Sequence, residues 1–154
     1  MEWQLKKFNE LTTTELYKIM KARVDVFVVE QNCPYPELDN HDQVSLHLFS
    51  EKEGIIVAYS RLIPKENIYD QASIGRVLVD KHHRGKDYAK KLMKKSIEVI
   101  LDEWKENEIK IHGQEYLRKF YGSLGFKEIS EVYLEDNIPH VDMILKVEEK
   151  ILDK

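Results

Sequence analysis

Residues 74–104, IGRVLVDKHHRGKDYAKKLMKKSIEVILDEW, form the stretch around which the rest of the chain is organised. The stretch begins with a β-rich run in which residues 77–79 are consecutive apolar residues, as is typical of a strand buried on both faces. A short basic turn, KHHRGK at 81–86, follows. From Tyr88 to Trp104, apolar residues recur at roughly helical spacing. The stretch therefore predicts a strand, a basic turn containing glycine, and an amphipathic helix.

The junction between this turn and the helix predicts an anion site. The first N–H groups of a helix lack partners within the helix, and the helix dipole adds partial positive charge there. A phosphorylated ligand fits such a site. The turn matches neither the Walker phosphate loop nor the dinucleotide pattern G-x-G-x-x-G. The alternative interpretation is an ordinary basic turn before an amphipathic helix.

Length and composition describe a single globular domain covering residues 1–154, with 42% hydrophobic and 34% charged residues. No apolar run approaches the ~20 residues that span a bilayer, and the N-terminal residues lack the apolar segment of a secretory signal. These features predict a cytoplasmic protein without a membrane partner. The net charge of −4 argues against broad nucleic-acid binding.

The single cysteine, Cys33, allows no internal disulfide and no multi-cysteine metal site. It lies in a long irregular connection, EQNCPYPELDNH at 30–41, of the kind that is often functional. The acidic residues and the histidine of this segment lack close paired-ligand spacing, so we expect no metal there, and the sequence predicts no metal site elsewhere. No partner base marks Cys33 as a nucleophile, and a small buried cysteine is the favoured interpretation.

The remaining patterns predict an α+β (α/β) fold with a central mixed β-sheet flanked by helices. Thr12 and Glu15 form a capping-box pattern that opens a helix ending near Gln31. A further short helix is expected at 115–124. Besides the strand at 74–80, strands are expected at 3–8, 45–50, 55–64, 109–112, 126–134 and 140–147, the last two joined by 135–139.

Four segments of the chain resemble the GNAT N-acetyltransferases. Residues 84–89, RGKDYA, resemble the family's acyl-CoA pyrophosphate loop, usually Arg/Gln-x-x-Gly-x-Gly/Ala, with Asp87 where the family usually has Gly. Residues 114–126, QEYLRKFYGSLGF, resemble its second hallmark, a helix that carries Phe-Tyr and ends in Gly-Phe. FVVEQNCPYPELD at 27–39 and EVYLEDNIPH at 131–140 resemble the ElaA-type branch. The four matches stand in the order that the family has them.

The resemblance implies a GNAT acyl-CoA N-acyltransferase fold in which acetyl-CoA, the co-substrate, binds in a V-shaped opening between strands 74–80 and 109–112. Backbone groups of two strand residues would pair with the pantetheine arm, as in strand addition. Backbone N–H groups of the loop would hold the pyrophosphate. The cofactor-binding residues so implied are Val77, Leu78, Val79, Arg84, Gly85, Lys86, Asp87, Tyr88, Ala89 and Gln114.

The same resemblance implies that Tyr121, the Tyr of Phe-Tyr, is the general acid that returns a proton to the CoA thiolate. A tyrosine with an ordinary pKa of about 10 stays protonated at neutral pH, which suits that step. A primary amine attacks the thioester directly, and a base must first take its proton. The candidates are Glu30, His47, Glu135 and His140. Of these, His140 lies in the matched Ile-Pro-His segment; a structural hydrogen bond is its equally favoured alternative.

The resulting functional prediction is an acetyl-CoA-dependent N-acetyltransferase acting on a small molecule or an exposed amine. The alternatives are a non-catalytic CoA-binding or regulatory module of the same fold, and a phosphate-binding protein unrelated to acetyl transfer. Arg61 and Arg76 are expected either to be paired structurally or to face an acidic group of the acceptor. The acceptor itself is not encoded in a recognisable motif, and the oligomeric state is left open, with a homodimer among the alternatives.

Overall fold

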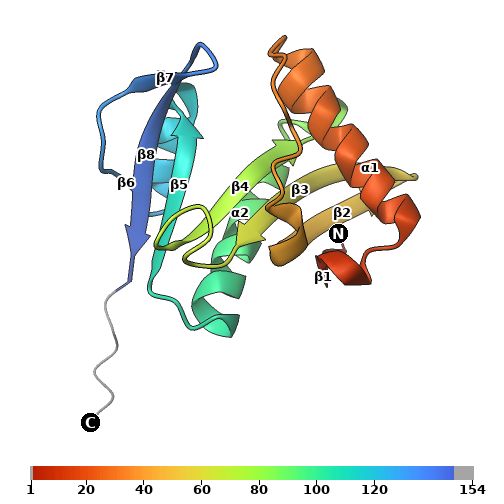
Figure 1. The fold of residues 1–154 in the computed structure, drawn as a ribbon, viewed down its shortest axis with the longest axis horizontal. Coiled ribbons are helices and arrows are strands. Elements are labelled where there is room, and N and C mark those ends of the chain that lie inside the picture. Colours follow the sequence, from red (N-terminus) through yellow and green to blue (C-terminus); the bar gives the residue numbers. More distant parts are fainter. Residues whose placement is uncertain (1, 148–154) are drawn as a thin grey trace.

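The computed structural model describes residues 2–147, which form one mixed eight-stranded sheet with helices on its faces (Figure 1). The strand order is β1-β2-β3-β4-β5-β8-β6, and β7 also pairs with β8. Every pair is antiparallel except β4 with β5. This confirms the predicted fold class. The strands are β1 (Gln4–Lys7), β2 (Leu46–Lys52), β3 (Ile55–Ile63), β4 (Ala72–Val79), β5 (Glu108–Gln114), β6 (Lys127–Glu128), β7 (Tyr133–Glu135) and β8 (Ile138–Lys146).

The first helix begins with the predicted capping box. The Thr12 hydroxyl accepts from the Glu15 backbone N–H at 3.0 Å, and the Glu15 carboxylate accepts from the Thr12 N–H at 2.9 Å. Two α-helices continue into wider π-helical turns, and the third follows a 3-10 turn. The helices are α1 (Thr13–Val24), extended by Asp25–Glu30; α2 (Tyr88–Glu98), extended by Val99–Glu103; and α3 (Arg118–Ser123), preceded by Glu115–Leu117.

Helices α1 and α2 cover opposite faces of the sheet, with α1 in front of it and α2 behind it in Figure 1. Successive strand residues point to opposite faces. Accordingly, Phe49 packs in a cluster with Ile19 of α1, whereas the preceding Leu48 packs in another with Leu92 of α2. Strand β3 lies between the two helices and is buried at every position after Ile55. The central strands are therefore held rigidly on both sides.

Strands β4 and β5 pair only at their first residues and then diverge (Figure 1). The paired positions are Ala72 with Ile109 and Ser73 with Lys110. In β4, Arg76 and Val77 together oppose the single β3 residue Ser60, which makes a β-bulge with Arg76 at a φ of 50°. The divergence opens the V that the family resemblance implied.

The prediction of one continuous strand at 126–134 is wrong, because the segment forms two short strands, β6 and β7, that both pair with β8. Between them, the Ser130 hydroxyl accepts the Asp142 backbone N–H at 2.9 Å, in the place where a strand carbonyl would accept it. The pairing shifts by two residues across this interruption. A side chain thus breaks a ladder that the hydropathy pattern predicted as continuous.

The closing hairpin is also tighter than predicted. The expected connection at 135–139 reduces to a two-residue turn of Asp136 and Asn137, with φ angles of 51° and 63°. Two consecutive left-handed residues are the requirement of a type I′ hairpin turn, which Asp and Asn tolerate. Strand β5 also extends beyond the strand predicted at 109–112, because Gln114 ends it and pairs with His140 of β8. Within residues 2–147, no helix has the length and apolar character needed to cross a membrane.

Candidate active site

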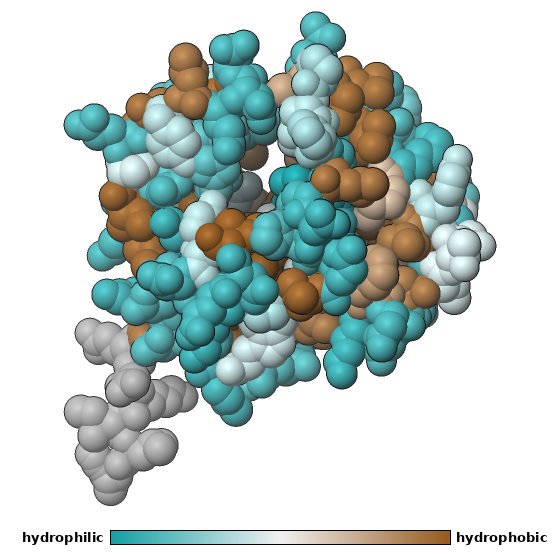
Figure 2. Space-filling model, viewed as in Figure 1, coloured by the Kyte–Doolittle hydropathy of each residue, from teal (hydrophilic) through white to brown (hydrophobic). Residues whose placement is uncertain are grey.

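A cleft of about 1140 Å³ follows the divergence of β4 and β5. Figure 2 shows it as a hollow between the part of the molecule that contains β5 and β8 and the part that contains α1. Tyr121 and His140 line this cleft together with every predicted cofactor-binding residue except Lys86, which is exposed outside it. The structure therefore brings the pyrophosphate loop, the diverging strands and both predicted catalytic residues to one space.

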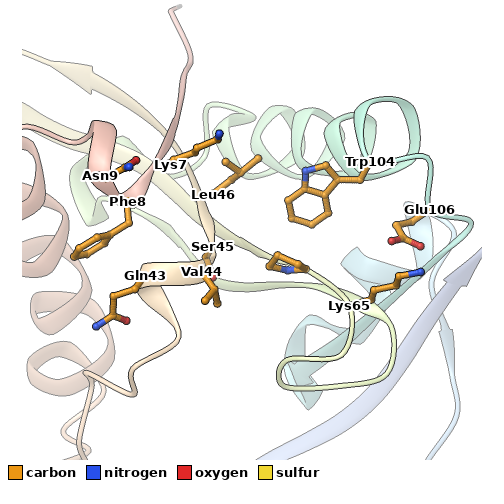
Figure 3. A pocket seen from close by; sticks show the side chains of 11 residues that line it. Lys7, Phe8, Asn9, Gln43, Val44, Ser45, Leu46, Lys65, Trp104 and Glu106 are labelled. Carbon is orange, nitrogen blue, oxygen red and sulfur yellow. The ribbon is translucent and has the colours of Figure 1, made fainter.

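A second, shallower depression of about 610 Å³ lies elsewhere on the molecule (Figure 3). Phe8 and Gln43 lie on one side of it, and Trp104 and Lys65 lie on the other. None of the predicted site residues lines it. Its lining includes Lys7, Lys65 and Glu106 but no histidine, whereas the larger cleft holds all but one of the predicted site residues and is therefore the candidate site.

The loop between β4 and α2, the predicted anion site, is held by side-chain hydrogen bonds and two left-handed residues. The Asp80 carboxylate accepts from the His82 backbone N–H at 3.1 Å and pairs with the His83 ring at 2.9 Å, which fixes the start of the loop. Gly85 and Asp87 both have left-handed backbones, with φ angles of 82° and 63°. The left-handed position explains why glycine suits residue 87, and Asp is among the residues that tolerate it.

Asp87 is also the N-cap residue of α2, but its carboxylate caps none of the backbone N–H groups of the helix. A carboxylate that capped the helix would have accepted hydrogen bonds from the same backbone N–H groups that an anion would use. The first N–H groups of α2 consequently stay available for a phosphate oxygen. The negative charge of the carboxylate remains unfavourable for a pyrophosphate bound beside it.

Arg84 does not direct its guanidinium at the anion site. The guanidinium makes two hydrogen bonds to Glu30, of 2.7 and 3.0 Å, and a third to the Val79 carbonyl at 3.0 Å. The hydrogen bonds to Glu30 raise the pKa of Arg84, against a smaller opposing effect of burial. This pairing ties the loop to the end of the first helix. It also occupies the carboxylate of Glu30, one of the predicted base candidates.

Tyr121 of α3 is buried, with its ring packed against the backbone of β5. A Cβ placed on Gly113 would lie only 3.0 Å from Tyr121 Cε2, so the absence of a side chain there makes room for the ring. Burial raises the pKa of Tyr121 to about 12. Within residues 2–147, no protein group hydrogen-bonds its hydroxyl, although the residue lines the cleft. The hydroxyl is therefore protonated at neutral pH and free to donate.

His140 of β8 makes a structural hydrogen bond, which is one of the two alternatives that the sequence left open. Its Nδ1 lies 2.7 Å from the Ile138 carbonyl oxygen. Because a carbonyl only accepts, Nδ1 carries the hydrogen, and Nε2 of the neutral ring is left with a free lone pair. The hydrogen bond fixes the ring at the hairpin, and the same bond leaves a basic nitrogen available.

Sequence reasoning missed His112 of β5, which stacks on His140 with ring centroids 4.6 Å apart. Its Nε2 contacts the Glu135 carboxylate, and its Nδ1 lies 3.2 Å from Asp142 Oδ1 and also contacts the Tyr133 hydroxyl. The available signal was strand alternation, because His112 shares a face of β5 with Gln114. Glu135 and His140 are thus the two base candidates that the structure brings together.

Asp142 anchors this cluster. Burial alone would raise its pKa, but hydrogen bonds from Tyr133 and His112 and the positive charge of Lys110 outweigh that effect, so the pKa lies below its ordinary value. The Tyr133 hydroxyl donates to it at 2.6 Å, and Lys110 Nζ lies 3.7 Å from its other oxygen. Asp142 is consequently ionised at neutral pH and orients the groups around it.

A buried ion-pair network holds the irregular segment 31–45 against the sheet. The Arg23 side chain, which is fully buried, donates to Glu37 at 2.8 Å and to Asp42 at 2.6 Å. Arg61 makes two 2.8 Å hydrogen bonds to Asp39, and Arg76 donates to Glu37 at 2.6 Å. Arg61 and Arg76 are therefore paired with carboxylates of the protein itself, which is one of the two expectations from the sequence.

His47, the remaining base candidate, belongs to this network and does not line the cleft. Its ring lies between the Tyr59 hydroxyl, at 2.7 Å, and the Asp42 carbonyl, at 2.9 Å. Burial lowers its pKa, so the ring is neutral and structural. Cys33, as expected, is buried; its Sγ lies 3.7 Å from the Asp136 carbonyl oxygen, which links the segment to the closing hairpin.

The site geometry agrees with comparisons to known proteins. A family model described as an acetyltransferase (GNAT) domain matches residues 15–147. The chain belongs to the GNAT acetyltransferase family. Within that family it is 37% identical over 149 residues to protein ElaA of Escherichia coli, covering 96% of this chain and 97% of ElaA. It is 43% identical over 149 residues to a UPF0039 protein of Schizosaccharomyces pombe, covering 96% and 98% of the two chains.

Solved structures of GNAT proteins show the same fold. The crystal structure of an acyl-CoA N-acyltransferase from Pseudomonas aeruginosa superposes with a TM-score of 0.89 at 37% identity, over 94% of this chain and 98% of that one. The crystal structure of Escherichia coli ElaA gives a TM-score of 0.87 at 36% identity, over 95% and 100%. The predicted family, branch and fold are confirmed, and the family is one of acyltransferases.

Proposed function

We propose that this protein is an acetyl-CoA-dependent N-acetyltransferase that moves the acetyl group directly to a primary amine. One observation carries the proposal: the anion loop, the free Tyr121 hydroxyl and the free Nε2 of His140 all line a single cleft. The similar Pseudomonas aeruginosa protein is described as an acyl-CoA N-acyltransferase, which supports an acyl-CoA donor here. The acetyl group and the amine acceptor are the parts that the proposal adds.

In the proposed reaction, the loop at 84–89 holds the pyrophosphate and the backbone of β4 beyond the bulge pairs with the pantetheine arm. His140 Nε2 takes a proton from the acceptor amine, whose nitrogen then attacks the thioester carbonyl. A C–N bond forms as the C–S bond breaks, and the attacking nitrogen releases its second proton to solvent. Tyr121 gives its proton to the departing thiolate, and solvent restores both residues. No acyl-enzyme forms.

The acceptor pocket is proposed to lie between the segment 31–45 and the closing hairpin. In this part of the cleft, Asp39, Glu135 and Asp136 contribute three negative charges, and Arg61 and Arg76 contribute two positive charges. The remaining negative charge favours a cationic amine over an anionic acceptor. The pocket supplies no motif that selects one amine, so the acceptor is proposed as a class.

The test begins with thermal unfolding of the full chain in the presence of acetyl-CoA, CoA or ATP. A ligand that binds only the folded state raises its apparent stability, and we expect a rise with both CoA forms and none with ATP. A rise with ATP as well would favour a general phosphate-binding protein. Absence of any shift with either CoA form would overturn the proposal.

A second assay measures the release of the CoA thiol from acetyl-CoA in the presence of a panel of primary amines. It distinguishes an acetyltransferase from a non-catalytic CoA-binding module. Tyr121→Phe should reduce kcat about 100-fold while leaving the acetyl-CoA thermal shift in place, because it removes only the proton donor. Tyr17→Phe, at an exposed tyrosine of α1, is the matched control. A thermal shift without thiol release for any amine would support the non-catalytic CoA-binding alternative.

A further inference from the structure

Three potential metal ligands converge at the β5–β8 side of the cleft. His112, Glu135 and His140 each offer one ligand atom, and these atoms lie within 4.8 Å of one another. Glu135 is 23 residues from His112 in the sequence, so these potential ligands form no short motif that could be recognised from the sequence. The sequence predicted no metal site, and the ligand set that was considered and rejected was the one around Cys33. The histidine cluster is a different set of residues.

Both histidines have the hydrogen bonds that metal-bound imidazoles require. A ligating histidine usually donates its second ring N–H to a carboxylate or a backbone carbonyl, which fixes the tautomer and the ring orientation. His140 donates Nδ1–H to the Ile138 carbonyl at 2.7 Å, and His112 Nδ1 lies 3.2 Å from Asp142 Oδ1. In each ring Nε2 is then the potential ligand atom: that of His140 has no partner among the described residues, and that of His112 contacts the Glu135 carboxylate, the third potential ligand. Tyr133 in turn holds Asp142 with a 2.6 Å hydrogen bond.

The ligand types select among metals. Two imidazoles and one carboxylate are the three protein ligands of many catalytic zinc sites, where the fourth position stays open to water or substrate. His112, Glu135 and His140 all line the cleft, so that fourth position would face it. Hard cations such as Mg²⁺ and Ca²⁺ prefer all-oxygen ligands and fit this set poorly.

We propose that His112, Glu135 and His140 bind one Zn²⁺ ion at this end of the cleft. Neighbouring charge favours the cation, since Asp142 and Glu135 together outnumber the single positive charge of Lys110. Zinc at this site uses the Nε2 lone pair of His140. If His140 is the base of the proposed acetyl transfer, zinc occupancy inhibits that reaction; this consequence, unlike the binding itself, rests on the proposed function.

The binding test uses the full chain after removal of metals with a chelator. Isothermal titration with Zn²⁺ should show one site per chain, and titration with Co²⁺ should give the visible absorption of a four-coordinate ion. Glu135→Gln and His112→Asn should each weaken zinc binding about tenfold or more. Glu131→Gln, an exposed carboxylate ahead of the same hairpin, and His82→Asn, an exposed histidine, should bind as the parent does.

The acetyl-CoA thermal shift, repeated on each variant, shows that the cleft has folded. Zinc binding that is equally strong in His112→Asn and in the controls would overturn the proposal, as would the absence of one-site binding in the parent. Thiol release by a protein that does not bind zinc would overturn the proposed zinc site and leave the proposed acetyltransferase function standing. Zinc binding without thiol release for any amine leaves the site intact and removes the proposed function.

Discussion

The two walls of the cleft are built by different means. The loop wall, residues 79–89, offers mainly backbone N–H groups and a helix start, and its arginine points away to Glu30. The side-chain wall, the cluster of His112, Glu135 and His140 with the ion pairs of Arg61 and Arg76, depends on ionisable groups that hold one another. Side-chain substitutions should therefore be mild on the loop wall and severe on the side-chain wall.

The largest expected effect comes from the buried ion pairs behind the side-chain wall. Arg23→Ala should lower the free energy of unfolding by about 3–5 kcal/mol, because it strands Glu37 and Asp42 as buried, partly unpaired carboxylates. Lys21→Ala removes an exposed pair with Asp25 on the same helix and should cost about 0.5 kcal/mol at most. Urea unfolding measures both. Equal costs for the two variants would show that this network does not anchor the segment.

The next effect concerns the proposed base. His140→Gln should lower kcat for thiol release about 100-fold, because the amine loses its proton acceptor. Its acetyl-CoA thermal shift should be that of the parent, since the loop wall is untouched. Glu131→Gln serves as the control ahead of the same hairpin. A variant that lost CoA binding and kcat together would assign His140 to the architecture of the cleft instead.

A smaller effect should follow from crowding Tyr121. Gly113→Ala places a Cβ 3.0 Å from the tyrosine ring, so either the ring or strand β5 must shift by a few tenths of an ångström. We expect kcat to fall about tenfold with little change in KM for acetyl-CoA, since near-ångström misplacement of a catalytic group costs up to about 100-fold. Gly122→Ala meets nothing within 4 Å and is the control. Equal kcat values would mean that the ring position is not limiting.

The smallest effect is expected on the loop wall. Asp87→Asn removes a carboxylate beside the pyrophosphate site but keeps a residue that tolerates the left-handed backbone, so the Kd for CoA should fall about threefold. Asp87→Ala removes the same charge and adds backbone strain, so its folded state should be less stable than that of Asp87→Asn. Calorimetric titration with CoA, with thermal unfolding, distinguishes charge from conformation. Weaker binding by Asp87→Asn would mean that the carboxylate assists the ligand.

The sequence predicted the loop wall of the cleft more completely than the side-chain wall. The loop wall is one contiguous segment, so its strand, glycine turn and helix could be predicted together, and the structure has all three. His112 could not be found that way, because its partners Glu135 and Asp142 are 23 and 30 residues distant. The split of the strand at 126–134 was equally hidden, since it depends on one hydroxyl, that of Ser130, replacing a backbone acceptor.

The bulge in β4 changes which positions of the strand face each side of the sheet. Before the bulge, Gly75 faces the same side as Arg61, and after it Leu78 faces the same side as Tyr59. One extra residue has thus exchanged odd for even positions within a single strand. A deletion of Arg76 would leave a strand that still pairs with β3 but presents a regular edge to the cleft. The form of the edge that β4 presents to the cleft therefore depends on the number of residues in the strand, which no conservative substitution changes and a single-residue deletion at the bulge would change.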